Sequence, residues 1–161
     1  ANPLSNTPMG RAMNAGFEVF ERSTRRYGKP DFGIETTETA SGPVSVEEHV
    51  VWSKPFCDLI HFKRDLPKNH KKQSKILIVA PMSGHYATLL RGTVETLLPN
   101  SEIYITDWTD ARIVPQSSGT FDLDDYVDYL IDMFNTLGPD THVMAVCQPS
   151  VPVLAAVALM E

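Results

Sequence analysis

The sequence contains only two cysteines, Cys57 and Cys147, among its 161 residues. Two cysteines so far apart do not make a compact disulfide framework, and two thiolates cannot complete a four-ligand zinc site. Long apolar runs are also missing, because none approaches the ~20 residues that span a bilayer. No charged and then apolar leader opens the chain. We therefore expect a cytoplasmic protein with reduced thiols, no membrane span and no metal.

Basic charge is scarce as well. Lysine and arginine number 14 against 20 acidic residues, which gives a net charge of −6. Nucleic acid is excluded as the main partner, because binding phosphates requires a basic face. Hydrophobic residues make up 42% of the chain, close to the average for a globular protein. The length and composition predict one compact domain with a substantial core.

The first part of the chain predicts a helix followed by antiparallel strands. Thr7 and the proline after it indicate a helix start, and the apolar periodicity continues to Tyr27. Residues 31–43 are rich in turn-forming residues and are predicted to be irregular. Glu48–Ser53 and Cys57–Lys63 alternate in polarity, which predicts a half-exposed antiparallel pair.

The second half alternates regularly between strands and helices. The predicted strands are Lys75–Ala80, Glu102–Thr106 and Val143–Val146, and the predicted helices are Thr88–Leu98, Asp122–Leu137 and Val151–Met160. Continuous apolar strands separated by helices are typical of a parallel α/β sheet buried on both faces. We expect residues 1–43 to be a lead-in, and residues 44–161 to form part of an α/β domain.

Cys147 lies where the last predicted strand turns into the last helix, in the sequence Ala145-Val146-Cys147-Gln148-Pro149. A nucleophile elbow has this strand–turn–helix context and is usually written G-x-S-x-G. The partial positive charge of a helix N-terminus favours a thiolate there. The pentapeptide departs from the motif at both glycines. Taken alone, it fits a small buried apolar residue better than a nucleophile.

The turn after Lys75–Ala80 has the sequence Pro81-Met82-Ser83-Gly84-His85. An elbow needs two backbone N–H groups to hold an oxyanion, one after the nucleophile and one in a neighbouring strand-to-helix loop. By position, these are the amides of Gln148 and Met82. An ordinary strand-to-helix connection explains the same turn equally well.

Several longer stretches carry a family resemblance. "APMSGHYATLLRGTVETLLP", "IYITDWTDARIVP", "FDLDDYVDYL" and "VCQPSVPVLAAVALM" together resemble the intracellular polyhydroxyalkanoate (polyhydroxybutyrate) depolymerases, as do "KPFCDLIHFKRD" and the opening "NTPMGRAMNAGFEVFERSTRRYGKPDFGI". The resemblance implies an α/β-hydrolase-like fold and hydrolysis of stored polyester through a cysteine nucleophile, here Cys147. It also implies a granule-associated location in the cytoplasm, the polymer as partner, and no cofactor.

The acid and the base of a hydrolase triad follow the nucleophile along the chain. No histidine follows Cys147, and the only later carboxylate side chain is that of Glu161. We therefore expect this chain to be the amino-terminal portion of a longer enzyme that supplies both groups from its C-terminal part.

Among the residues present, His85 is the nearest candidate base, although a local structural role is the more common one for such a histidine. Asp107 and Asp110 are interpreted as caps or loop anchors rather than as the triad acid. Trp108 and Tyr86 are candidates for an acyl pocket, with packing as the ordinary alternative. The other four histidines are assigned to surface or packing roles: His49, His61, His70 and His142.

Two alternatives to the depolymerase remain open. Polyhydroxyalkanoate synthases also use a cysteine, but their motif is similar to G-x-C-x-G, and Pro149 stands at its last position here. A non-catalytic granule-associated protein is the other. Release of hydroxybutyrate rather than coenzyme A separates the hydrolase from the synthase.

Overall fold

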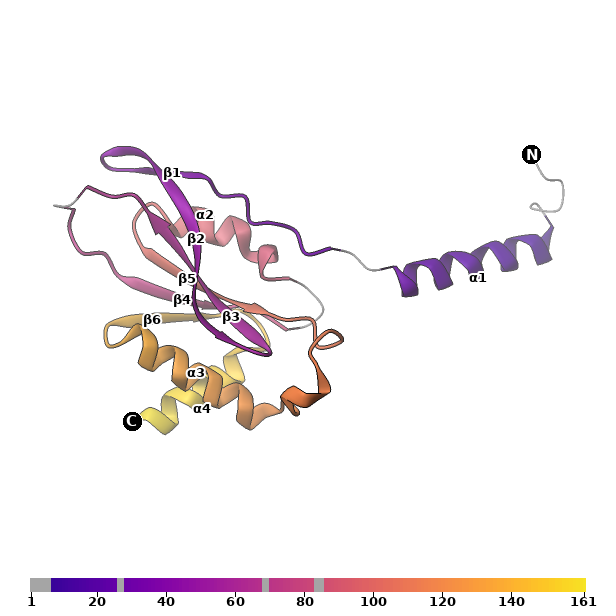
Figure 1. Ribbon diagram of the computed structural model, residues 1–161. Coiled ribbons are helices and arrows are strands. Elements are labelled where there is room, and N and C mark those ends of the chain that lie inside the picture. Colours follow the sequence, from indigo (N-terminus) through magenta and orange to yellow (C-terminus); the bar gives the residue numbers. More distant parts are fainter. Residues whose placement is uncertain (1–6, 26–27, 68–69, 83–85) are drawn as a thin grey trace.

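The computed structural model describes residues 7–25, 28–67, 70–82 and 86–161. A curled, six-stranded mixed sheet runs in the order β1-β2-β3-β5-β4-β6 (Figure 1). Its strands are β1 (Thr36–Thr39), β2 (Gly42–Lys54), β3 (Cys57–Arg64), β4 (Lys75–Val79), β5 (Glu102–Trp108) and β6 (Thr141–Ala145). The pairs β1–β2, β2–β3 and β3–β5 are antiparallel. Strand β4 runs parallel to both β5 and β6.

The α-helices of the described residues are α1 (Pro8–Thr24), α2 (Arg91–Leu97), α3 (Leu123–Leu137) and α4 (Ser150–Met160). Helix α2 lies on one face of the sheet, whereas α3 and α4 cover the other (Figure 1). This division follows from the topology. The connection from β4 to β5 crosses the sheet in one direction, and the connection from β5 to β6 crosses it in the other. Because both crossovers have the same handedness, they lie on opposite faces of the sheet.

The two faces bury separate hydrophobic clusters. On the α3 and α4 face, Leu77 and Val79 of β4 share one cluster with Leu130 and Met133 of α3, and all four side chains are fully buried. On the α2 face, Ile78 lies with the other cluster, whose members include Phe62, Val94, Ile103 and Ile105. Alternation along β4 thus sends successive apolar side chains into different cores, as expected for a strand covered on both faces.

Helix α3 begins and ends as the sequence indicates. Asp122 is its N-cap and accepts hydrogen bonds from the amides of Asp124 and Asp125, while the Asp125 carboxylate accepts one from the Asp122 amide. This reciprocal capping box satisfies donors that the first turn leaves open. Gly138 ends the helix with a φ of 77°, a conformation that favours glycine.

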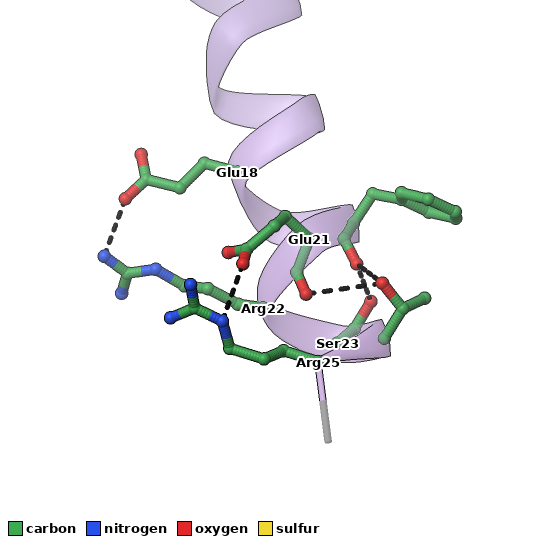
Figure 2. Close-up of polar contacts among 7 residues, drawn as sticks. Glu18, Glu21, Arg22, Ser23 and Arg25 are labelled. Atoms are coloured by element: carbon green, nitrogen blue, oxygen red, sulfur yellow. Dashed lines mark hydrogen bonds and ion pairs between the residues drawn. The ribbon is translucent and has the colours of Figure 1, made fainter. Parts of the chain in front are cut away.

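Helix α1 begins as predicted, with the Thr7 hydroxyl accepting a hydrogen bond from the Gly10 amide, but it ends at Thr24. The predicted end at Tyr27 lies outside the described residues. Two ion pairs, each between residues four positions apart, support the last turns of the helix: Glu18 with Arg22 and Glu21 with Arg25 (Figure 2). No residue of α1 is buried, and Figure 1 shows the helix apart from the sheet.

The structure corrects several boundaries. Residues 31–43 are not irregular throughout, because Thr36–Thr39 pairs with β2 and forms the edge strand β1. The helix predicted at Thr88–Leu98 is a 3₁₀ turn (Ala87–Leu90) followed by α2. Strand β3 is mostly buried rather than half exposed, because its side chains enter the hydrophobic cores on both faces of the sheet.

The strand predicted to be buried at Val143–Val146 is β6, which lies at a sheet edge. It pairs only with β4 among the described residues, and Val143 is 36% exposed. The helix that follows is apolar on all sides, yet it leaves large side chains uncovered, among them Val151, Leu154 and Leu159. In the part of the chain that the structure describes, no helix is both long and apolar enough to cross a membrane.

Candidate active site

Cys147 lies at the turn that joins β6 to α4, at the carboxyl edge of the parallel strands. The Val146 amide still donates to the carbonyl oxygen of Val79 at 3.2 Å, so the chain remains attached to β4 up to the residue before the cysteine. Helix α4 begins three residues after Cys147, with Pro149 as its N-cap. The bend is therefore confined to a few residues between two fixed elements.

The backbone at Cys147 is in the left-handed region, with a φ of 68°. Only one other non-glycine residue among those described shares this feature, Asp140 with a φ of 65°. Aspartate visits this region comparatively easily, whereas a cysteine there carries steric strain of about 1 kcal/mol. Strained residues of this kind gather at functional sites, and a sharp, strained turn is what presents the nucleophile in an elbow.

The strained turn is held by the first turn of α4. The Cys147 carbonyl oxygen accepts hydrogen bonds from the Ser150 hydroxyl at 2.6 Å and from the Ser150 amide at 3.2 Å. These contacts fix the backbone of the cysteine while its side chain stays exposed. Among the described residues, no side chain hydrogen-bonds the Cys147 thiol.

The predicted oxyanion residues flank this turn. Val79 pairs with Ala145 in the parallel register of β4 and β6, so the turns that contain Met82 and Gln148 leave the sheet at the same level. Neither amide donates a hydrogen bond within the described part of the chain. Gln148 is exposed and Met82 is partly buried against the α3-side core. The two N–H groups thus belong to neighbouring loops on the same sheet edge as Cys147.

The candidate base His85 lies outside the described residues. The remaining histidines are elsewhere. His61 stacks on Tyr104 with ring centroids 4.3 Å apart, and burial lowers its pKa. His49 contacts Glu47, and His70 bonds the carbonyl oxygen of Pro67. His142 is exposed on β6, toward the end opposite Cys147.

Asp107 and Asp110 have different surroundings. Asp110 anchors the turn after β5, because its carboxylate accepts hydrogen bonds from the Arg112 amide and guanidinium. Asp107 was expected in a loop or cap, but it is the penultimate residue of β5 and is only 6% exposed. Its Oδ2 pairs with the Lys29 ammonium. The sequence gives no sign of this contact, because the two residues are 78 positions apart.

Trp108 is packed into the core, as the ordinary alternative for it expects, and its role in an acyl pocket stays a prediction. Its indole N–H donates to the carbonyl oxygen of Ala80 at 2.9 Å, and its ring packs against Phe121 and Tyr126. It also lines a cavity together with Tyr86. Trp108 therefore ties the end of β5 to the residue just before Pro81 and Met82.

Comparison of the chain with protein-family models, with curated proteins and with solved structures gave no match. The resemblance of the motifs and the geometry around Cys147 are therefore what bears on the function of this chain. No group of three or more histidine, cysteine or carboxylate side chains placed to hold a metal ion occurs among the described residues.

Proposed function

We propose that the protein is a carboxylic ester hydrolase with an α/β-hydrolase-like fold that uses Cys147 as its nucleophile. The substrate class is poly(3-hydroxyalkanoate), as the motif resemblance implies, with the storage granule as the site of action. The observation that carries the proposal is the exposed thiol held at a φ of 68° between a parallel strand and a helix. This strand–turn–helix setting is the structural context that an elbow motif requires.

In the proposed reaction, the Cys147 thiolate attacks the ester carbonyl carbon and forms a C–S bond. The amides of Met82 and Gln148 hold the negative charge that develops on the carbonyl oxygen. Collapse of this intermediate breaks the C–O bond, and the departing alkoxide takes a proton to become a hydroxyl end. Water then attacks the thioester, which releases the hydroxy acid and restores the thiol.

The thiol proton must pass to a base before attack. The described histidines lie away from Cys147, so the resemblance assigns this role to an Asp–His pair later in the enzyme's chain. The described residues thus contribute the nucleophile, the proposed oxyanion amides and the scaffold that strains the turn. Pro149 distinguishes the site from the G-x-C-x-G pattern of the synthases.

The test uses the full-length protein and particles of amorphous poly(3-hydroxybutyrate). We expect Cys147→Ala to lower the release of 3-hydroxybutyrate by at least about a thousandfold, because the reaction loses its nucleophile. Alanine keeps a Cβ at the strained position, so circular dichroism and the melting temperature should change little. Cys57→Ala is the matched control and should retain activity. Undiminished hydrolysis by Cys147→Ala would refute the assignment, and release of coenzyme A from an acyl thioester would favour the synthase.

A further inference from the structure

Helix α1 carries apolar side chains that no other part of the described structure covers. Met9, Met13, Phe17 and Phe20 recur at intervals of four and three residues, so they share one side of the helix. Each is more than half exposed, and α1 has no buried residue. Met13, Phe17 and Phe20 line a hollow on this side together with Gly16. The proposed mechanism assigns no role to these four large side chains, which we call the α1 stripe.

The charged side chains of α1 lie away from the stripe, and most of them are paired. Glu18 pairs with Arg22 at 2.6 Å, and Glu21 pairs with Arg25 at 2.8 Å (Figure 2). Within the described residues, Arg11 is the one charged side chain of α1 that forms no ion pair. An anionic membrane surface attracts helices that are rich in lysine and arginine, so a single unpaired arginine contributes little there. The α1 stripe instead matches a surface that is apolar and uncharged.

The α1 stripe is also small for contact with another protein. A stable interface takes about 20–30 residues from each partner, whereas the stripe offers four large side chains. Figure 1 shows α1 apart from the sheet, so no neighbouring element of the described structure enlarges this surface. A deformable apolar phase needs no partner of matching shape, because the side chains only have to leave water.

The chain that follows α1 is fixed to the sheet at the edge where Cys147 lies. The Lys29 ammonium pairs with the Asp107 carboxylate near the carboxyl end of β5, and Phe32 is buried in the α2-side core. Arg25 caps α1 four residues before Lys29, so the end of the helix lies within about 14 Å of Lys29. A surface bound by α1 is therefore held close to the carboxyl edge of the parallel strands.

We propose that α1 holds the enzyme on the surface of its insoluble polyester, with the α1 stripe in contact with the polymer and the ion pairs facing water. Poly(3-hydroxyalkanoate) carries alkyl side groups and no charged groups along its chain, as this surface requires. The inference rests on the proposed function and adds to it how the polymer is recognised. Binding through α1 places the polymer surface at the sheet edge that carries Cys147.

The test measures binding of the full-length Cys147→Ala protein to particles of amorphous poly(3-hydroxybutyrate) by co-sedimentation, so that no hydrolysis interferes. Phe17→Gln combined with Phe20→Gln should weaken binding at least about tenfold, because two aromatic side chains no longer leave water. Glutamine favours helix at least as well as phenylalanine, so circular dichroism should show no loss of helix. Glu18→Gln combined with Arg22→Gln is the matched control. It removes an ion pair from the polar side without changing the net charge and should bind as the parent does.

The same variants separate the polymer from other occupants of the stripe. Binding to the particles should change less than about twofold between 50 and 500 mM NaCl, because no charge contributes to it. Unchanged binding of the phenylalanine variant would overturn the proposal, and so would tighter binding of the parent to phosphatidylglycerol vesicles than to the particles. A lower melting temperature of that variant would overturn it too, since the stripe would then pack against the enzyme's own chain. A dimer of the parent that the variant abolishes would assign the stripe to a second copy.

This inference and the proposed function can fail separately. Binding that depends on the α1 stripe, without hydrolysis of the particles by the wild type, would refute only the proposed function. Hydrolysis by the wild type, with unchanged binding of the phenylalanine variant, would refute only this inference.

Discussion

The two cysteines of the chain have opposite surroundings. Cys57 begins β3, is completely buried in the α3-side core, and donates its thiol hydrogen to the carbonyl oxygen of Asp58 at 3.3 Å. Cys147 is exposed at a turn, and no side chain among the described residues bonds its thiol. Burial raises the pKa of the Cys57 thiol well above its ordinary value. Residue type alone therefore does not distinguish an exposed, strained thiol from a packing residue, whereas backbone position does.

The difference originates in the parallel sheet. Cys57 belongs to an antiparallel strand whose side chains alternate between two cores, so its thiol replaces a small apolar group. Cys147 follows a parallel strand at its carboxyl end, where the chain must reverse into a helix. The strain at Cys147 persists because Val79 on one side and Ser150 on the other hold the adjoining backbone.

Thiol labelling should show the largest effect. We expect an alkylating reagent such as iodoacetamide to modify Cys147 at least about a thousandfold faster than Cys57, because Cys57 reacts only when the sheet opens. Mass spectrometry of peptides taken over time measures both rates in one sample. In denaturant the two rates should converge. Similar rates in the native protein would contradict the contrast between the two sites.

The positive φ at Cys147 allows a second comparison, between the stability of the wild type and that of a variant with glycine at this position. Cys147→Gly should raise the free energy of unfolding by up to about 0.5 kcal/mol, because removing about 1 kcal/mol of Cβ strain outweighs the entropy that glycine adds to the unfolded chain. Chemical denaturation of the variant and the wild type measures the change.

Asp140→Gly is the matched control for this substitution. Asp140 has nearly the same φ, 65° against 68°, but aspartate tolerates the left-handed region better. The gain at position 140 should therefore be smaller than at position 147. A loss of stability in Cys147→Gly would mean that the turn is not strained by its side chain.

The sequence predicted those parts of the fold that local patterns determine. The apolar run of β4 and the amphipathic, capped helix α3 were both confirmed. Strand β1 was missed because its four residues, Thr36–Thr39, are polar and are held by pairing with β2 rather than by burial. Strand β6 was predicted to be buried, since its composition does not reveal that one side lacks a partner in the described sheet.

The candidate site was predictable to the same extent. The proline-containing turn after β6 indicated a bend at Cys147, but no residue pattern specifies a left-handed cysteine. The buried pairing of Asp107 with Lys29 depends on tertiary structure, and the aspartate alone suggested a loop. The oxyanion roles of Met82 and Gln148 stay predictions.

The smallest expected effect concerns Cys57 and pH. Its pKa is raised in the folded protein, chiefly by burial, so the folded state keeps the thiol proton where the unfolded chain begins to lose it. The stability that this contributes is fully present below the ordinary thiol pKa of 9.0 and declines as pH rises through and above it. By linkage, this one thiol lowers the free energy of unfolding by about 0.4 kcal/mol at pH 9 relative to pH 7.

Denaturation of the wild type and Cys57→Ala between pH 7 and pH 9 isolates this contribution. The range stays below the region where Tyr104 and Tyr126 matter, because burial raises the pKa of both hydroxyls above their ordinary value of 10.0. The variant should lose about 0.4 kcal/mol less than the wild type over this range, whatever its stability at pH 7. The contradicting outcome is a Cys57→Ala variant with the same pH dependence of stability as the wild type. The buried thiol would then ionise as readily in the folded protein as in the unfolded chain. The two cysteines would differ in exposure alone.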